Sequence, residues 1–336
     1  MTDPIQVLKS MKKEHDFFVG IDSDGCAFDT MEVKHKYCFV VAVLHAFGLA
    51  ALARILRDVW DFVNLNGQTR GCNRWLALRE TFRYLMELSP YERFDGPLRA
   101  HLDVIEQFIH AADQTPEITL SNEGLVRFAE TKLDGRARKL LKTIVAEPVS
   151  LANSPQGREL VGANTDADHC LLRLALWTHL VNGMVAIRVH DVPPFPHVRE
   201  SLQKVAAKAD VMVVSATPGE ALQREWVEHD IAQYARLICG QEMGKKAEHL
   251  KYGAGGKYDP DKVLMIGDAP GDMKAAKANN ALFYPVMLGD EAASWQRFYE
   301  EAADRFLAGT YGGKYEQDLI AAFDASLPKT PPWKKP

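Results

Sequence analysis

Two aspartates directly follow an apolar run near the start of the chain. Phe17-Phe18-Val19-Gly20-Ile21 leads into Asp22-Ser23-Asp24-Gly25. An apolar run that ends in acids is typical of a buried parallel strand with carboxylates at its carboxyl end. In open α/β sheets this is the edge where ligands bind. Two carboxylates so close together suit phosphoryl transfer, because one can attack phosphorus while the other moves protons. A divalent cation would offset their crowded negative charge.

Three later segments place polar or charged residues just after predicted strands. They are Ser215 at the end of strand 211–215, Lys246 after strand 236–239, and Asp268 with Asp272 after strand 263–268. Because the carboxyl ends of parallel strands meet at one edge of a sheet, we expect a hydroxyl, an ammonium and two groups of carboxylates around one small volume. Such a set would bind a polyanion together with a hard cation.

Each of these residues also has a purely structural interpretation. Ser215 could cap the helix that follows it, Lys246 could be an ordinary surface lysine, and Asp268 and Asp272 could form a turn around Pro270-Gly271. Their spacing favours the joint site. Lys246 lies 31 positions after Ser215 and 22 before Asp268, and each gap fits about one crossover between parallel strands.

The composition is that of an ordinary globular protein. Of 336 residues, 47% are apolar and 25% are charged, and the formal net charge is −5. The length predicts roughly two domains, and the near balance of acids and bases gives no electrostatic footprint for nucleic acid. The five cysteines are scattered and form no C-x-x-C pair. This argues against a disulfide framework or a zinc site and favours a reducing compartment.

No segment is predicted to cross or enter a membrane. Residues 1–16 are charged and lack the apolar centre of a signal peptide. The most apolar stretch, 38–56, is interrupted by His45 and Arg54, so we expect a buried helix there rather than a span. We therefore expect a cytoplasmic protein without nucleic-acid or membrane partners.

The secondary-structure signals indicate an α/β domain with a helical insertion after its first strand. The insertion is predicted to contain helices at 31–58, 74–88, 97–113, 122–133, 135–146 and 166–182, and a strand at 184–189. After a Pro-rich connector at 191–196, strands alternate with helices, which specifies a parallel sheet. The predicted domains are a core of 1–30 and 190–327 and an insertion of 31–189, followed by a mobile tail at 328–336.

As an ordered set, the singled-out residues resemble the motifs of phosphatases in the haloacid dehalogenase superfamily. The matching elements are Asp22-x-Asp24-Gly25, Ser215 after an apolar strand, Lys246, and Gly267-Asp268-x-x-x-Asp272. The resemblance implies a Rossmann-like α/β core with a parallel sheet of strand order 5-4-1-2-3, and a helical cap inserted after the first motif. Cys26 stands where threonine is usual in this family, a departure that we expect to leave the chemistry intact.

The resemblance implies a role for each motif carboxylate. Asp22 would attack phosphorus and form an aspartyl-phosphate intermediate. Asp24 would protonate the leaving oxygen and later take a proton from the hydrolytic water, which usually requires a raised pKa. Mg²⁺ would be held by the Asp22 carboxylate, the Asp24 backbone carbonyl and Asp268, while Asp272 would orient a metal-bound water.

The remaining motif residues would hold the phosphoryl oxygens of the substrate. Ser215 and Lys246 would contribute side chains, and the backbone around Gly25 and Ala216 would contribute N–H groups. Lys245 is the alternative to Lys246. We prefer Lys246 because Lys246-Ala247-Glu248-His249-Leu250 resembles the lysine-initiated helix of the family.

A polar loop inside the insertion, residues 64–74, is predicted to help select the substrate. It contains Arg70, Asn73 and Arg74, whose side chains would suit an anionic or hydroxyl-rich small phosphorylated metabolite. In enzymes with this type of cap, a glycine-containing loop near this position reaches the site. The alternative is an interhelical turn with solvated arginines.

Other functions, both enzymatic and non-enzymatic, fit parts of this motif pattern. A phosphomutase would keep the same motifs and return the phosphoryl group to a sugar. Phosphonatases and haloacid dehalogenases of this family usually lack the second aspartate, so Asp24 argues against both. A catalytically retired binding scaffold would be expected to lack a motif carboxylate or the lysine, and all are present. The sequence therefore favours a Mg²⁺-dependent phosphohydrolase.

Overall fold

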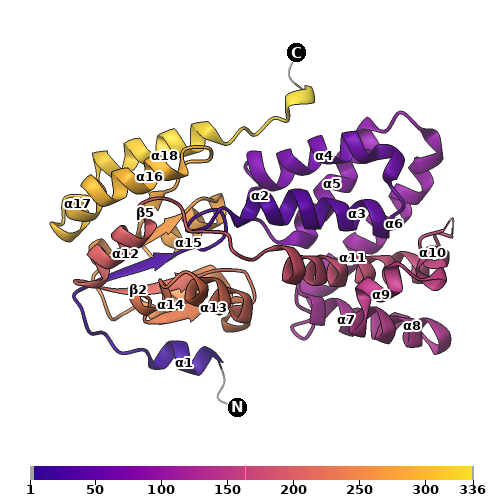
Figure 1. Cartoon of the computed structure of the whole chain (residues 1–336), viewed down its shortest axis with the longest axis horizontal. Coiled ribbons are helices and arrows are strands. Elements are labelled where there is room, and N and C mark those ends of the chain that lie inside the picture. The colour runs from indigo at the N-terminus through magenta and orange to yellow at the C-terminus, as the bar shows by residue number, and fades with distance from the viewer. Residues whose placement is uncertain (1–3, 163, 335–336) are drawn as a thin grey trace. The chain divides into compact units, whose positions relative to one another are not determined.

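The computed structural model describes residues 4–162 and 164–334. They form two compact units, and Figure 1 labels many of their helices and two of the strands, β2 and β5. The first unit contains the described residues before Glu32, the segment Asn66–Gly71, and the described residues after His190. The second contains the described residues of Glu32–Leu65 and Cys72–His190. The Asn66–Gly71 segment thus belongs to the first unit, although its neighbours along the chain belong to the second.

The first unit is built on one parallel sheet. Its strands are β1 (Phe17–Ile21), β2 (Ala209–Val214), β3 (Leu237–Cys239), β4 (Val263–Gly267) and β5 (Leu282–Pro285). The five strands are all parallel and have the order β3-β2-β1-β4-β5. This confirms the predicted α/β fold class, because the order is 5-4-1-2-3 read from the other edge.

Helices cover both faces of this sheet, which is why its central strands are apolar along their whole length. Val19, Val211 and Leu264 pack on one face, whereas Phe18, Met212 and Met265 pack on the other. The first face is covered by α12 (Val198–Ala206), α13 (Gly219–Glu228), α16 (Glu291–Arg297) and α17 (Ala303–Leu307). The second is covered by α1 (Pro4–Ser10), α14 (Lys246–Gly253), α15 (Pro270–Ala278) and α18 (Lys314–Ser326).

The second unit is helical among its described residues. Its longer helices are α3 (Val40–Ala46), α4 (Ala53–Asp61), α5 (Arg74–Leu88), α6 (Asp95–Gln114), α7 (Asn122–Lys132), α8 (Gly135–Ala146) and α11 (Ala167–Arg188). Two short helices that we did not predict, α9 (Pro148–Ala152) and α10 (Pro155–Leu160), each begin with proline. Helix α11 packs against α3, α6, α7, α8 and α9, and so forms the centre of this unit.

Two predictions for the insertion are wrong. The single helix expected at 31–58 is interrupted at Gly48, whose φ of +66° ends α3 in the left-handed conformation that glycine adopts readily. The strand expected at 184–189 is the last part of α11, which continues to Arg188. Extending an existing helix costs little because each added residue gains a hydrogen bond, and this outweighs the weak strand preference of a short apolar run.

Helix α11 is the one described helix that is long and apolar enough to cross a membrane. Its most apolar window is 61% buried within the protein, and Arg173 is buried in its first half. A central helix of a folded domain has this same composition.

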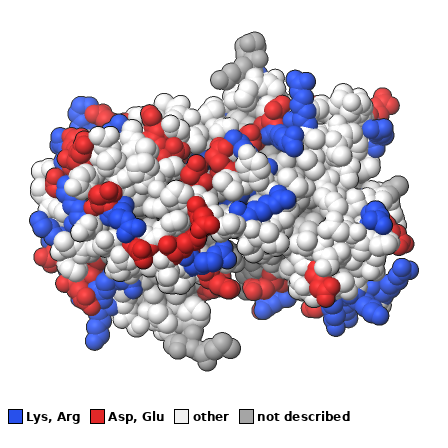
Figure 2. All heavy atoms as spheres, viewed as in Figure 1, with Lys and Arg blue, Asp and Glu red and all other residues white. Residues whose placement is uncertain are grey.

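The surface carries charges of both signs. On the face shown in Figure 2, acidic and basic side chains lie among uncharged ones. In the tail predicted at 328–336, Pro332–Lys334 form a short 3₁₀ helix, and residues 335–336 lie outside the described residues.

Candidate active site

The carboxyl ends of three central strands meet at one edge of the sheet. Asp22, Ser215 and Asp268 follow β1, β2 and β4 directly. Ile21 pairs with Val213 on one side and with Ile266 on the other, so the residues after these strands lie next to one another. The Asp22 N–H continues the ladder by donating to the Ile266 carbonyl at 3.0 Å.

Lys246 joins two of the predicted carboxylates. It is the first residue of α14, and its Nζ lies 2.6 Å from Asp22 Oδ2 and 2.7 Å from Asp272 Oδ1. Burial alone would lower the pKa of Lys246, but the two carboxylates outweigh it and the net pKa is raised. The preceding Lys245 is exposed. The geometry therefore favours Lys246 over Lys245 as the lysine of the site.

Asp22, Asp268 and Asp272 form a buried cluster whose carboxylate oxygens lie within 4.8 Å of one another. Burial raises the pKa of Asp268 and of Asp272, and the neighbouring carboxylates add to this while Arg70 or Lys246 opposes it. Oδ1 of Asp268 is buried without a hydrogen-bond partner. An unsatisfied carboxylate oxygen beside two other acids fits the requirement of a hard divalent cation such as Mg²⁺ for oxygen ligands.

The carboxylate of Asp24 has a different environment from that cluster. Its Oδ1 accepts a short hydrogen bond from the Thr30 hydroxyl, and its Oδ2 accepts one from the Thr217 hydroxyl at 2.7 Å. Thr217 lies two residues after Ser215 in the same turn. Neither threonine was singled out by the sequence analysis. The position of Thr217, two residues after Ser215, was the sequence feature that could have identified it as a site residue.

Ser215, Gly25 and Ala216 lie in the turns after β1 and β2. The buried Ser215 Oγ accepts from the Thr217 N–H at 3.2 Å, so it stabilises the turn. It does not cap the following helix α13, whose N-cap residue is Pro218. Ala216 is exposed. Gly25 has φ +77°, and a Cβ there would lie 2.5 Å from Asp268 Oδ2 and 2.7 Å from Arg70 Nη2. Glycine is therefore required for this close approach.

Two buried tryptophans hold the turn after Asp22, and the sequence analysis missed both. Trp226 on α13 donates from Nε1 to Ser23 Oγ at 3.0 Å, and Trp295 on α16 donates to the Cys26 carbonyl at 2.7 Å. Both side chains are fully buried. Each indole thus satisfies a polar atom of the turn that carries Asp22 and Asp24.

Arg70 reaches the acidic cluster from the Asn66–Gly71 segment. Its Nε and Nη2 lie 2.8 and 2.7 Å from Asp268 Oδ2, and Nε also contacts the Asp268 carbonyl at 3.2 Å. The Arg70 side chain is 2% exposed. In the structure Arg70 is paired with the Asp268 carboxylate, and its predicted role in substrate binding stays a prediction.

Asn73 and Arg74 belong to the second unit. Asn73 caps helix α5 by accepting from the Trp75 N–H at 3.0 Å. Arg74 donates to Thr178 Oγ1 at 3.2 Å and to Asn182 Oδ1 at 3.0 Å, and its guanidinium lies 5.2 Å from the centre of the Phe39 ring. Their predicted role in substrate binding stays a prediction.

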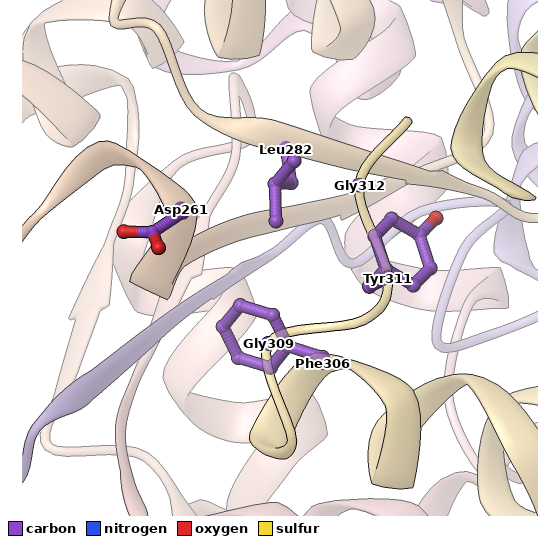
Figure 3. A pocket seen from close by; sticks show the side chains of 6 residues that line it. All are labelled: Asp261, Leu282, Phe306, Gly309, Tyr311 and Gly312. Carbon is purple, nitrogen blue, oxygen red and sulfur yellow. The ribbon is translucent and has the colours of Figure 1, made fainter. Parts of the chain in front are cut away.

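A separate small cavity of about 120 Å³ lies in the first unit, away from these strand ends. It is lined by Asp261, Leu282, Phe306, Gly309, Tyr311 and Gly312 (Figure 3). Asp261 precedes β4 and Leu282 is the first residue of β5, so the cavity lies at the amino ends of these strands. The acidic cluster lies at the opposite, carboxyl ends.

Comparison with known proteins gives one family match. The model of a family described as haloacid dehalogenase-like hydrolase matches residues 155–286. This range includes Ser215, Lys246, Asp268 and Asp272, and it excludes Asp22 and Trp295. No curated protein matches the chain.

Proposed function

We propose that the chain is a Mg²⁺-dependent phosphohydrolase of the haloacid dehalogenase-like hydrolases, the family whose model matches residues 155–286. In this proposal it releases phosphate from a small phosphorylated metabolite in the cytoplasm. The observation that carries it is the Lys246 ammonium, which lies between Asp22 and Asp272 at the edge where β1, β2 and β4 end. This ammonium and the three buried carboxylates at that edge suit a phosphoryl group and its metal.

Asp22 is the proposed nucleophile. A carboxylate oxygen of Asp22 forms a bond to phosphorus while the bond from phosphorus to the leaving oxygen breaks, which gives an aspartyl-phosphate. The Ser23 N–H donates to Asp22 Oδ1 at 2.8 Å and Lys246 donates to Oδ2. These two bonds fix the orientation of the carboxylate before the reaction.

Asp24 is the proposed general acid and base. It gives its proton to the leaving oxygen in the first step. In the second step it takes a proton from the water whose oxygen bonds to phosphorus, the bond from phosphorus to the Asp22 oxygen breaks and phosphate leaves, so the enzyme returns to its starting state. The Thr30 and Thr217 hydroxyls hold its side chain. This separate setting suits a proton-transfer role, because the Asp24 carboxylate stays outside the buried cluster of Asp22, Asp268 and Asp272.

The proposed metal ligands are Asp22, Asp268 and the Asp24 backbone carbonyl, and Asp272 beside them would orient a water of the metal. When bound, Mg²⁺ would offset the negative charge of the phosphoryl oxygens. Lys246 and Ser215 would act on the same oxygens as donors, and the N–H groups near Gly25 and Ala216 would complete the set. Removal of one such donor, for example in Ser215→Ala, is expected to lower kcat on the order of 10²-fold.

The proposal is tested by assaying phosphate release from a panel of phosphomonoesters with Mg²⁺ or with EDTA. We expect Mg²⁺-dependent release by the parent protein and none by Asp22→Asn. Asp261→Asn is the matched control, because Asp261 is an exposed aspartate of the same unit at the opposite ends of the strands.

Near-normal turnover by Asp22→Asn on several esters would show that Asp22 is not the nucleophile. Isomerisation of a sugar phosphate without phosphate release would instead identify a phosphomutase. Absence of turnover across the whole panel, with an intact fold, would favour a binding scaffold.

A further inference from the structure

Arg70 occupies one oxygen of a proposed metal ligand. Both Nε and Nη2 contact Oδ2 of Asp268, while Oδ1 of the same carboxylate has no hydrogen-bond partner. Arg70 and Asp268 are each only 2% exposed at their side chains. Their attraction is therefore screened little by water.

The segment that carries Arg70 is shaped for this contact. The Arg70 N–H donates to the Gly67 carbonyl at 2.9 Å, which closes a turn. Gly71 has φ +67°, and a Cβ there would lie 2.8 Å from the Cβ of Ala269, the residue after Asp268. Gly25 leaves room for the guanidinium on another side. Three separate features of the backbone thus admit Arg70 to the acidic cluster.

The charges of the cluster explain what this contact does. Asp22, Asp268 and Asp272 contribute three negative charges when ionised, and Lys246 and Arg70 contribute two positive ones. A divalent cation bound to Asp268 would lie near the guanidinium on the same carboxylate. The cation and the guanidinium are both positive, and like charges bound to one buried carboxylate repel strongly. Arg70 and the cation therefore each weaken the binding of the other to the Asp268 carboxylate.

We propose that Arg70 is an internal counter-ion that competes with the divalent cation for Asp268. This inference rests on the proposed metal dependence, and it adds a residue that regulates the affinity for the metal. The docked Arg70 lowers the affinity for the metal, and metal binding releases the Asn66–Gly71 segment from Asp268. The coupling is reciprocal, because docking of Arg70 weakens metal binding by the same factor by which bound metal weakens the docking.

The first test measures the dissociation constants of Mg²⁺ and Mn²⁺ by calorimetry for the parent protein and three variants. Arg70→Met keeps most of the side-chain volume and removes the charge, so it is expected to tighten metal binding by about tenfold or more. Arg70→Lys keeps the charge and should stay closer to the parent. Arg305→Met, which removes an arginine paired with Glu301 in the same unit, should leave the constants unchanged.

The second test follows hydrogen exchange of the Asn66–Gly71 amides in the parent protein. Saturating Mn²⁺ is expected to speed their exchange, because the segment loses its contact with Asp268. Adding Asp268→Asn to Arg70→Met should remove the gain in metal affinity.

The competition is wrong if Arg70→Met binds metal no more tightly than the parent, or if Mn²⁺ slows exchange of the segment. Circular dichroism of each variant separates these outcomes from misfolding, and Arg70→Lys provides a folded comparison. If Arg70→Met gains metal affinity but no phosphomonoester is hydrolysed, the competition stands and the proposed function fails. If phosphate is released and Arg70→Met is unchanged, the proposed function stands and the competition fails.

Discussion

Replacement of Lys246 by methionine is the most direct perturbation of the candidate site. The ammonium lies 2.6 Å from Asp22 Oδ2 and 2.7 Å from Asp272 Oδ1. At an effective dielectric constant of about 20, each contact is worth about 6 kcal/mol before the cost of desolvation. Removing one partner of a buried ion pair usually costs about 3–5 kcal/mol. Because the Lys246 side chain is 15% exposed, we expect a loss near the lower value, about 3 kcal/mol.

The dependence on pH and metal follows from the carboxylates that remain. Burial raises the pKa of Asp268 and of Asp272, and loss of the Lys246 charge would raise both further. An acid with a raised pKa in the folded state favours folding at low pH and loses that contribution as pH rises. The destabilisation of Lys246→Met should therefore be small at about pH 5 and grow as pH rises through about 6 and 7, the pKa values of Asp268 and Asp272. Saturating Mg²⁺ should also reduce the destabilisation of Lys246→Met, because the bound cation supplies positive charge to the carboxylates.

Hydrogen exchange of the β1 and β4 amides in urea measures this loss for the first unit by itself. Lys245→Met is the matched control, because Lys245 is exposed and adjacent in sequence. We also expect Lys246→Met to lower kcat on the order of 10²-fold or more and Lys245→Met to leave it unchanged. Equal stability of the two variants at about pH 7 in EDTA would refute the reasoning, because breaking a buried ion pair should cost about 3–5 kcal/mol.

Three further predictions concern the surroundings of the site and the second unit. Gly25→Ala places a Cβ 2.5 Å from Asp268 Oδ2 at φ +77°, so it should destabilise by on the order of 2 kcal/mol in urea denaturation; unchanged stability would contradict the close approach. Trp295→Phe leaves the Cys26 carbonyl without its indole donor and should lower kcat more than it changes KM, whereas equal activity would exclude a positioning role. Burial lowers the pKa of His101 to about 4, so only the unfolded chain takes up its proton between about pH 6.5 and 4. The second unit should lose on the order of 3 kcal/mol across that range, and a His101→Gln variant that shows the same loss in hydrogen exchange would refute the assignment.

The sequence by itself predicted the sheet and the residues at its carboxyl edge. Apolar strands that end in Asp22, Ser215 or Asp268 carry this information locally, because a strand buried on both faces needs a continuous apolar run. The alternation of strands and helices then leaves few topologies to consider. Helix limits within the insertion were harder to predict. One glycine at position 48 and an extension of α11 outweighed the local propensities.

The contacts that shape the site were decided only by the tertiary structure. Arg70 and Asp268 are 198 positions apart in the chain, and Trp295 and Cys26 are 269 apart. The residues that flank an arginine or a tryptophan in the sequence do not predict which distant carboxylate or carbonyl will accept a hydrogen bond from its N–H group. That choice is made when packing buries both partners together, because a buried polar group without a partner is costly. Residue type and strand position thus determine which chemistry is available, and long-range burial determines which side chains hold it in place.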